Sequence, residues 1–229
     1  MGGMPVLAAV KLSEVDLDQL HVLDDAERQL AAKFGSTVHR DRFLAGRMAL
    51  RFHVADVAGV EPGSLHADYL CRSCGDEDRV HGAPRYRARA GGPWILASLS
   101  KSGDWCLMAA AANNQVRGVG VDLESSASAN FDGFGAVAMT ARERNQLQEV
   151  PAAQRPLFQT VLWTRKEAVL KALGSGLFVD PSLVDVAGPV PLLPERMSGP
   201  GRWVVEDVDP GPLGLADDCV AAMAVVLNV

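Results

Sequence analysis

The stretch from Gly118 to Glu124, which reads Gly-Val-Gly-Val-Asp-Leu-Glu, constrains this chain most strongly. Valine and leucine alternate in it with glycine and acidic residues, a period of two that is typical of a β-strand whose successive side chains point to opposite faces. Asp122 and Glu124 therefore share one face, on the order of 6–7 Å apart. Two such carboxylates repel each other unless a positive charge lies between them, and a divalent cation with oxygen ligands suits that place. By itself, the stretch also fits a strand that ends in a solvated turn.

A second informative stretch runs from Trp163 to Gly174. Its pattern predicts a helix that ends at Gly174, because glycine commonly terminates helices. Glu167 and Lys171 are four residues apart, so they lie one above the other on the helix surface. An ordinary surface ion pair would also explain these two residues, but the tryptophan and leucines among the charges indicate a face that is not purely solvated.

Together, and in this order, the two stretches resemble the signature of the 4′-phosphopantetheinyl transferases. That signature pairs (V/I)-G-(V/I)-D-x-E with a later W/F-x-x-K-E-(A/S)-x-x-K, and here the two parts are Val119–Glu124 and Trp163–Lys171. The length of the chain also resembles the surfactin-synthetase-activating type, which is a monomer made of two similar halves.

The resemblance implies an α+β fold, a pseudo-twofold pair of similar α/β halves with the active site in the cleft between them. Each half would be a small, mostly antiparallel sheet packed with helices. The expected halves are residues 1–115, on the coenzyme A nucleotide side, and residues 116–229, with the metal-binding strand and the signature helix. A faint internal repeat supports this division, since Arg47–Leu65 echoes Lys166–Leu183 as a helix, a loop and a proline-serine-leucine strand entry.

The resemblance also implies a reaction. In it, 4′-phosphopantetheine moves from coenzyme A to a serine of an apo acyl or peptidyl carrier protein and leaves adenosine 3′,5′-bisphosphate, in polyketide, nonribosomal peptide or fatty acid synthesis. Asp122, Glu124 and Glu167 would hold Mg²⁺, or Mn²⁺, on the pyrophosphate, with one of them acting through a water because Mg²⁺ takes few protein carboxylates. Glu167 would accept the serine proton, and Lys171 would bind the coenzyme and neutralise charge on the reacting phosphate. Asp122, Glu167 and Lys171 are thus the predicted catalytic residues.

Arginines of the first half are expected to hold coenzyme phosphates, because guanidinium groups match phosphate oxygens. Arg42 with Leu44–Gly46 is similar to the family's arginine before an L-x-G-like run. Arg40 and Arg47 are weaker candidates. From the residues alone, Arg47 and Arg51 also fit a solvated basic helix face.

Two departures from the family pattern affect the same coenzyme site. Family members commonly have G-K-P where this chain has Gly82–Pro84 with alanine in the middle, and Arg85 is expected to supply the missing positive charge. The family's S-x-S-H-S reads Ser98–Ser102 here. Ser100 and Lys101 are therefore expected to bind the coenzyme, but a lysine keeps its charge at neutral pH and cannot shuttle protons as histidine does.

The remaining pattern predicts the other elements. Helices are expected at 24–34 and 39–57, from 140 onward and at 163–173. Strands are expected at 6–10, 94–99, 105–112, 116–123, 183–186, 203–208 and 219–227. The strands at 94–99, 105–112 and 116–123 are expected to pair antiparallel in one sheet, and residues 61–86 to be mostly loop.

Composition bounds the partners and the location. The 229 residues are 48% hydrophobic, which is enough for one large domain or two small ones. A net charge of −6 argues against general nucleic-acid binding. No apolar run approaches a membrane span and no signal peptide is visible, so a cytoplasmic protein without a membrane partner is expected.

Two alternative functions rest on other residues. Cys71–Cys74 has zinc-ligand spacing, with His66 and His81 nearby, and a small zinc-containing interaction domain would use them. A catalytically decayed relative that binds a carrier protein or a nucleotide is the other alternative. Ala83 and Lys101 favour this second alternative, whereas the complete set of acidic and lysine residues in the two signature stretches argues against it.

Overall fold

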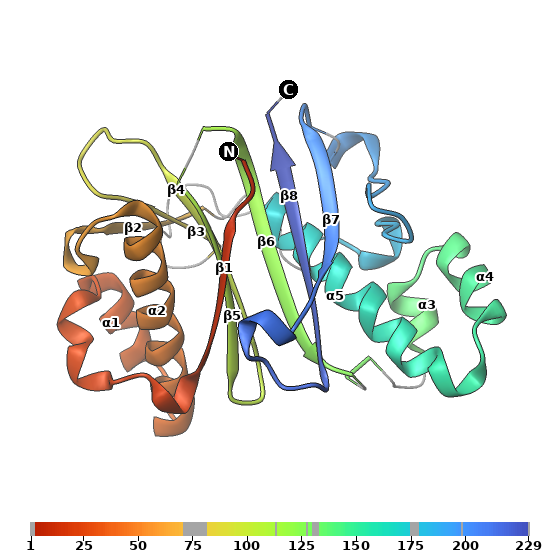
Figure 1. Cartoon of the computed structure of the whole chain (residues 1–229), viewed down its shortest axis with the longest axis horizontal. Helices are drawn as coiled ribbons and strands as arrows, with labels where there is room; N and C mark the ends of the chain where they lie inside the picture. Colours follow the sequence, from red (N-terminus) through yellow and green to blue (C-terminus); the bar gives the residue numbers. More distant parts are fainter. Residues whose placement is uncertain are drawn as a thin grey trace.

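The computed structural model describes residues 3–70, 82–112, 114–126, 128–129, 133–174, 179–197 and 199–228. Two antiparallel sheets pack face to face, and helices cover the two outer faces (Figure 1). This arrangement confirms the predicted α+β class. Within the described residues, no helix has the length and the apolar character that crossing a membrane requires.

The first sheet has five strands, and the long helix α2 (Thr37–Ala58) covers its outer face (Figure 1). A hydrogen bond from the His39 amide to the Ser36 side chain caps the start of α2, and Gly59 ends the helix in a left-handed conformation. In spatial order the strands are β1 (Val6–Lys11), β5 (Trp105–Ala111), β4 (Ile95–Ser102), β3 (Ala83–Arg87) and β2 (His66–Leu70). The smaller helical elements of this half are α1 (Asp25–Ala32), η1 (Leu12–Glu14), η2 (Leu17–Val22) and η3 (Pro62–Ser64).

The second sheet has three strands, and helix α5 (Arg155–Leu173) covers its outer face. The strands lie in the order β6 (Val116–Ser125), β8 (Cys219–Leu227) and β7 (Arg202–Val208). The smaller elements are α3 (Phe134–Ala138), α4 (Ala141–Glu149), η4 (Ala152–Gln154), η6 (Pro181–Leu183), η7 (Glu195–Met197) and η8 (Gly211–Leu213).

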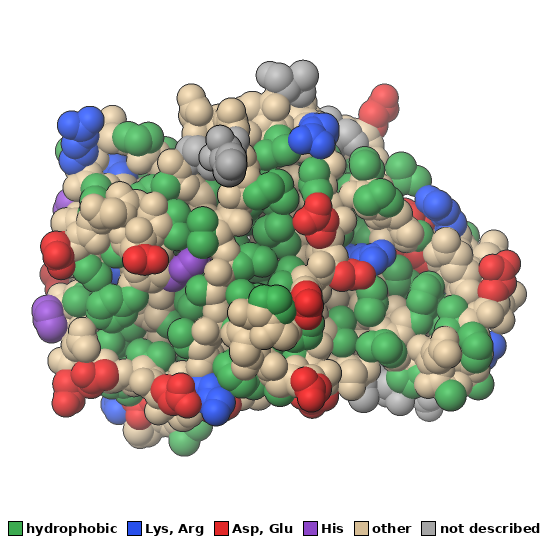
Figure 2. All heavy atoms as spheres, viewed as in Figure 1, with side chains coloured by type: hydrophobic (Ala, Val, Ile, Leu, Met, Phe, Trp, Pro, Cys, Tyr) green, Lys and Arg blue, Asp and Glu red, His purple; other side chains and the backbone are tan. Residues whose placement is uncertain are grey.

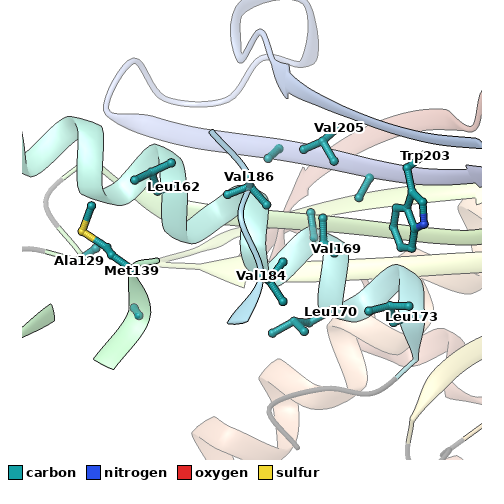
Figure 3. Close-up of a cluster of buried hydrophobic side chains, with 14 of the residues drawn as sticks. Ala129, Met139, Leu162, Val169, Leu170, Leu173, Val184, Val186, Trp203 and Val205 are labelled. Atoms are coloured by element: carbon teal, nitrogen blue, oxygen red, sulfur yellow. The ribbon is translucent and has the colours of Figure 1, made fainter. Parts of the chain in front are cut away.

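Three hydrophobic layers hold the two sheets and their long helices together, and a fourth cluster packs η2 and α1 against α2. One lies between α2 and the first sheet, one lies between the two sheets, and the third joins α5 to the second sheet. Figure 3 shows this third layer, in which Val169 and Leu173 of α5 lie near Trp203 and Val205 of β7. Both faces of β6 are therefore covered, one by the first sheet and the other by α5.

Most of the predicted elements are confirmed, but three expectations are wrong. The segment at 116–123 does not pair with β5; as β6 it pairs with β8 in the second sheet and only packs against the first. In the described residues of 61–86, most of the expected loop is replaced by regular elements, because β2 and β3 pair with each other and add to the sheet beside β4. Residues 183–186 form no regular strand, only the end of η6 and an isolated bridge between Asp185 and Leu192.

The internal repeat is visible in the structure as a buried cation in each half. In the first half the cation is Arg51, which is fully buried. Its Nη2 lies 2.8 Å from Glu27 Oε2, and its Nη1 donates to the Leu65 carbonyl at 2.7 Å. Glu27 also accepts a hydrogen bond from the Asp24 amide in a capping box at the start of α1.

In the second half the equivalent cation is Lys166, also fully buried. Its Nζ lies 2.7 Å from Glu143 Oε2 and donates to the carbonyls of Pro181 and Val184. Glu143 likewise belongs to a capping box, with Thr140 at the start of α4.

These contacts correct the register of the predicted repeat. Arg51, not Arg47, is the counterpart of Lys166, one helical turn away from the expected match. The helix ends agree, because Gly59 and Gly174 follow the two cations at equal spacing and have φ angles of 65° and 67°. Lys166, although part of the signature stretch, is therefore used to anchor α5 and does not face the cleft.

Candidate active site

Two glycines allow α5 to lie directly on strand β6. A Cβ atom on Gly120 would lie 1.9 Å from the Ala168 carbonyl oxygen and 2.6 Å from the Ala172 amide nitrogen. A Cβ atom on Gly118 would lie 2.6 Å from the Ala172 carbonyl oxygen. Only hydrogen fits at these two positions, so the glycines of the first signature stretch set the distance between strand and helix.

Asp122 is the centre of the polar contacts that follow from this packing, and its side chain is almost fully buried. Lys171 Nζ donates to Asp122 Oδ1 at 2.7 Å and to the Val121 carbonyl at 3.1 Å. Ser100 Oγ, from β4 of the other sheet, donates to the same Asp122 Oδ1 at 2.7 Å. Asp122 Oδ2 is buried and has no hydrogen-bond partner among the described residues.

Glu167 lies close enough to Asp122 and Glu124 for their negative charges to raise its pKa. Burial raises the pKa of Glu167 to about 7, with a further rise from the negative charge of Asp122 that Lys171 partly offsets. Its Oε1 is buried and, within the described part of the chain, unpartnered. A carboxylate with this pKa can accept a proton near neutral pH, as a general base must.

Glu124 is half-buried and completes the acidic group. Burial and the charge of Asp122 raise the pKa of Glu124, whereas hydrogen bonds from Ser128 and Trp163 lower it. Trp163 therefore lies close to a site carboxylate, a position that the sequence analysis did not assign to it.

The three carboxylates have the right chemistry for a hard divalent cation. Carboxylate oxygens are the ligands that Mg²⁺ and Mn²⁺ prefer, and Asp122 Oδ2 and Glu167 Oε1 are buried acceptors without a donor in the described structure. Among the described residues, however, no three His, Cys, Asp or Glu side chains are already arranged as a metal site. Mg²⁺ usually binds one or two carboxylates and keeps several waters. The residues therefore fit a hydrated cation held directly by two carboxylates better than one held by three.

A cleft opens beside these residues between the two halves. A cavity of about 250 Å³ is lined by residues from both sides, among them Arg47, Ala83 and Leu99 from the first half and Lys171 from the second. A second cavity of about 170 Å³ shares Ala83 and Lys171 with the first and extends to Arg85.

Positive side chains gather around Lys101, and two of them, Arg47 and Lys171, line the cleft. The pKa of Lys101 is lowered mainly by burial, and the nearby cations Arg47, Arg42 and Lys171 lower it further. Arg42 donates to the Gly103 carbonyl at 2.6 Å, and Arg47 stacks over the Tyr69 ring at 4.3 Å. Neither arginine, nor Lys101, forms an ion pair with a described carboxylate, so an anion would find uncompensated positive charge here.

Lys101 has room in this cluster because of a glycine on α2. A Cβ atom on Gly46 would lie 3.3 Å from Lys101 Cδ and 3.4 Å from Leu99 Cδ1. Gly46 belongs to the run that follows Arg42 in the predicted coenzyme motif. The close approach explains why a residue without a side chain suits this position.

Arg85 has a different environment from the one expected of a substitute for the missing lysine. Its guanidinium donates to Asp68 at 2.9 and 2.6 Å and lies over the Trp94 ring. Arg85 is not among the cations that lower the pKa of Lys101, although it lines the second cavity. Its role in coenzyme binding stays a prediction. Cys71–Cys74 and His81 lie outside the described residues, so the zinc alternative also stays a prediction.

Charge is dispersed on the face of the molecule that Figure 2 presents. Lysines and arginines are scattered there, with acidic and hydrophobic side chains between them. This pattern agrees with the net charge of −6.

Comparison with known proteins gives the class. Residues 118–193, from within β6 to beyond η6, match the model of the 4′-phosphopantetheinyl transferase superfamily. The chain is also 31% identical over 209 residues to the 4′-phosphopantetheinyl transferase HetI of Nostoc sp. strain PCC 7120, which covers 91% of this chain and 80% of that protein. The chain therefore belongs to the 4′-phosphopantetheinyl transferase superfamily and is an enzyme of that class, as its two signature stretches predicted.

Two solved structures are also similar to the chain. One is a holo-(acyl-carrier-protein) synthase from Bacillus anthracis str. Ames in complex with CoA (3′,5′-ADP), with a TM-score of 0.42 and 18% identity over 50% of this chain and 99% of that one. The other is the holo-[acyl-carrier-protein] synthase of Thermotoga maritima, with a TM-score of 0.40 and 21% identity over 50% of this chain and 65% of that one.

Proposed function

We propose that this protein transfers 4′-phosphopantetheine from coenzyme A to a serine of an apo acyl or peptidyl carrier protein, with the help of Mg²⁺ or Mn²⁺. The observation that carries the proposal is the proximity of opposite charges around Lys171. Lys171 pairs with the buried Asp122 at 2.7 Å, and it is also one of the cations that lower the pKa of Lys101. A substrate with a pyrophosphate and a further phosphate suits such a site, because it can bridge a metal ion and a group of cations.

The acidic residues would divide the work between binding the metal and moving a proton. Asp122, Glu124 and Glu167 would hold the cation, one of them through a water. When bound, the cation would neutralise charge on the pyrophosphate oxygens. Glu167, with its pKa raised to about 7, would accept the proton of the carrier serine, directly or through a water.

The cations would hold the substrate and stabilise the leaving group. The serine oxygen would form a bond to the phosphorus that bears the pantetheine, and the bond from that phosphorus to the leaving adenosine 3′,5′-bisphosphate would break. Lys171 would neutralise charge on the transferred phosphoryl or the leaving group, and Arg42, Lys101 and Arg47 would bind the coenzyme phosphates. Arg85 would take part only from the second cavity, which it lines.

The two halves, residues 1–115 and 116–229, would act together in a single monomer. Support comes from the cleft itself, since its lining combines Arg47 and Leu99 of the first half with Lys171 of the second. We place the enzyme in the cytoplasm, serving polyketide, nonribosomal peptide or fatty acid synthesis.

The proposal is tested by intact mass spectrometry of an apo carrier protein after incubation with the enzyme, coenzyme A and Mg²⁺. We expect the carrier to gain the mass of one phosphopantetheine group. The gain should vanish with EDTA and with Asp122→Ala, and Arg202→Ala, at an exposed position on β7, should leave it intact. A carrier that stays unmodified by the unaltered enzyme, across acyl and peptidyl carriers, would contradict the proposal.

A further inference from the structure

Two serines of β4 reach across to β6 in the other sheet. The Val121 amide donates to Ser98 Oγ at 3.1 Å, and Ser100 Oγ donates to Asp122 Oδ1 at 2.7 Å. Both serines are buried. The strand expected to bind the coenzyme is thus tied by hydrogen bonds to the strand that carries the site carboxylates.

The two bonds from Ser100 and Lys171 fix how Asp122 presents its oxygens. Both donors reach Oδ1, and Oδ2 receives none from the described residues. Rotating the carboxylate would break both bonds. Asp122 is therefore held with Oδ1 hydrogen-bonded to the protein and Oδ2 able to bind a metal ion. Hydrogen bonds to a ligand residue commonly orient it toward its metal in this way.

The same bond limits what else Ser100 can do. A serine hydroxyl has one hydrogen to donate, and a phosphate oxygen can only accept. While Ser100 donates to Asp122, it has no hydrogen left for a coenzyme phosphate. Its neighbour Lys101 points to the opposite face of the strand, against Gly46 of α2.

We propose that Ser100 is a positioning residue for Asp122 and not a coenzyme ligand. Its hydroxyl holds Oδ1 so that Oδ2 is presented to the divalent cation, while Lys101 on the other face of β4 serves the coenzyme. The inference rests on the proposed function, because it assigns Ser100 a task within that site. It replaces the expectation that Ser100 contacts coenzyme A.

The experiment separates metal binding from coenzyme binding. Mn²⁺ affinity is measured by electron paramagnetic resonance of the free ion, with no substrate present, and coenzyme A affinity is measured by calorimetry in EDTA. We expect Ser100→Ala to weaken Mn²⁺ binding on the order of tenfold. Coenzyme A affinity in EDTA should be unchanged, and Ser100→Thr, which keeps the hydroxyl, should restore Mn²⁺ binding.

Ser98→Ala is the matched control, since it removes the other hydrogen bond between the sheets without touching Asp122. It should leave Mn²⁺ affinity close to that of the unaltered protein. Equal losses in Ser98→Ala and Ser100→Ala would overturn the inference, because loosened sheets would then explain both. A Ser100→Ala protein that binds Mn²⁺ normally but coenzyme A weakly in EDTA would also overturn it.

The unaltered protein separates this inference from the proposed function. If the unaltered protein modifies the carrier but Ser100→Ala gives either of the two overturning results, only the inference fails. If the unaltered protein binds neither Mn²⁺ nor coenzyme A, the proposed function fails and the inference fails with it.

Discussion

Gly120 on β6 and Ala168 on α5 touch backbone to backbone: a methyl group on Gly120 would come within 1.9 Å of the Ala168 carbonyl oxygen. Ala168 directly follows Glu167 on α5, so this contact brings the helix close to the strand that carries Asp122. The hydrophobic layer shown in Figure 3 also holds α5 against the second sheet. Strand and helix can bring their charged side chains together only because this position has no side chain.

Gly120→Ala should therefore push α5 away from β6. We expect a loss of about 3 kcal/mol in the free energy of unfolding, as for an overpacked core, together with a large loss of transferase activity. Urea unfolding and the carrier modification assay measure the two effects. Gly63→Ala is the control, because a Cβ atom there meets no atom within 4 Å. Equal behaviour of the two variants would contradict the close packing.

Lys166→Met should destabilise the protein without removing a group from the cleft. It leaves Glu143 buried without its cation, and breaking a buried ion pair costs about 3–5 kcal/mol. Arg51→Met should have a similar cost in the first half, since Arg51 pairs with Glu27 in the same way. Urea unfolding measures both variants, with exposed Lys33→Met as the control. A Lys166→Met protein as stable as the control would show that the pair is not an anchor.

The stability of the metal-free protein should fall as pH rises from about 4.5 to 7. Burial raises the pKa of Glu167 from its usual 4.5 to about 7, so over this range the folded state holds a proton that the unfolded state releases. The loss is about 2–3 kcal/mol by pH 8, and Asp122, Glu124 and Lys171 are the charged groups that modify it.

Glu167→Gln should flatten this pH dependence, because an amide does not titrate. Thermal unfolding in EDTA between pH 5 and pH 8 measures the slope. Glu149→Gln, on the exposed side of α4, should keep the slope of the unaltered protein. If Glu167→Gln keeps that slope too, Glu167 is not the group responsible.

Lys101→Ala should weaken coenzyme A binding about tenfold, because it removes one of the grouped cations beside the cleft. The effect should shrink for 3′-dephospho-coenzyme A, if Lys101 serves the 3′-phosphate side of the nucleotide. Calorimetry with both ligands in EDTA provides the measurement. Arg202→Ala is the control, since Arg202 is exposed on β7 and does not line the cleft. Equal weakening for both ligands would place Lys101 elsewhere on the coenzyme.

Local patterns were sufficient to predict β6, α2 and the part of α5 that runs from Trp163 to its end at Gly174. They missed the first part of α5, Arg155–Leu162, because a proline is tolerated in the first turn of a helix and does not interrupt it there. The partner of β6 was not predictable in the same way. Its alternation shows that it is a strand, but both of its faces are buried, and no local signal distinguishes β8 from β5 as its neighbour. Strands β2 and β3 were missed because each is short and depends on pairing with distant strands.

The candidate site, like the fold, was predicted only in part. The grouping of Asp122, Glu124, Glu167 and Lys171 was expected from the two signature stretches. The hydrogen bond of Ser100 to Asp122 was not, because it depends on how the two sheets pack. The register of the repeat was misjudged for a similar reason, since burial and not charge type identifies Arg51 as the counterpart of Lys166.

The most direct test of the account is an anomalous difference map from crystals grown with Mn²⁺ and coenzyme A. The account predicts one strong peak within ligand distance of at least two of the carboxylates of Asp122, Glu124 and Glu167, beside the coenzyme pyrophosphate. A coenzyme bound in the cleft without any peak at these carboxylates, or a peak coordinated by other residues, would contradict it.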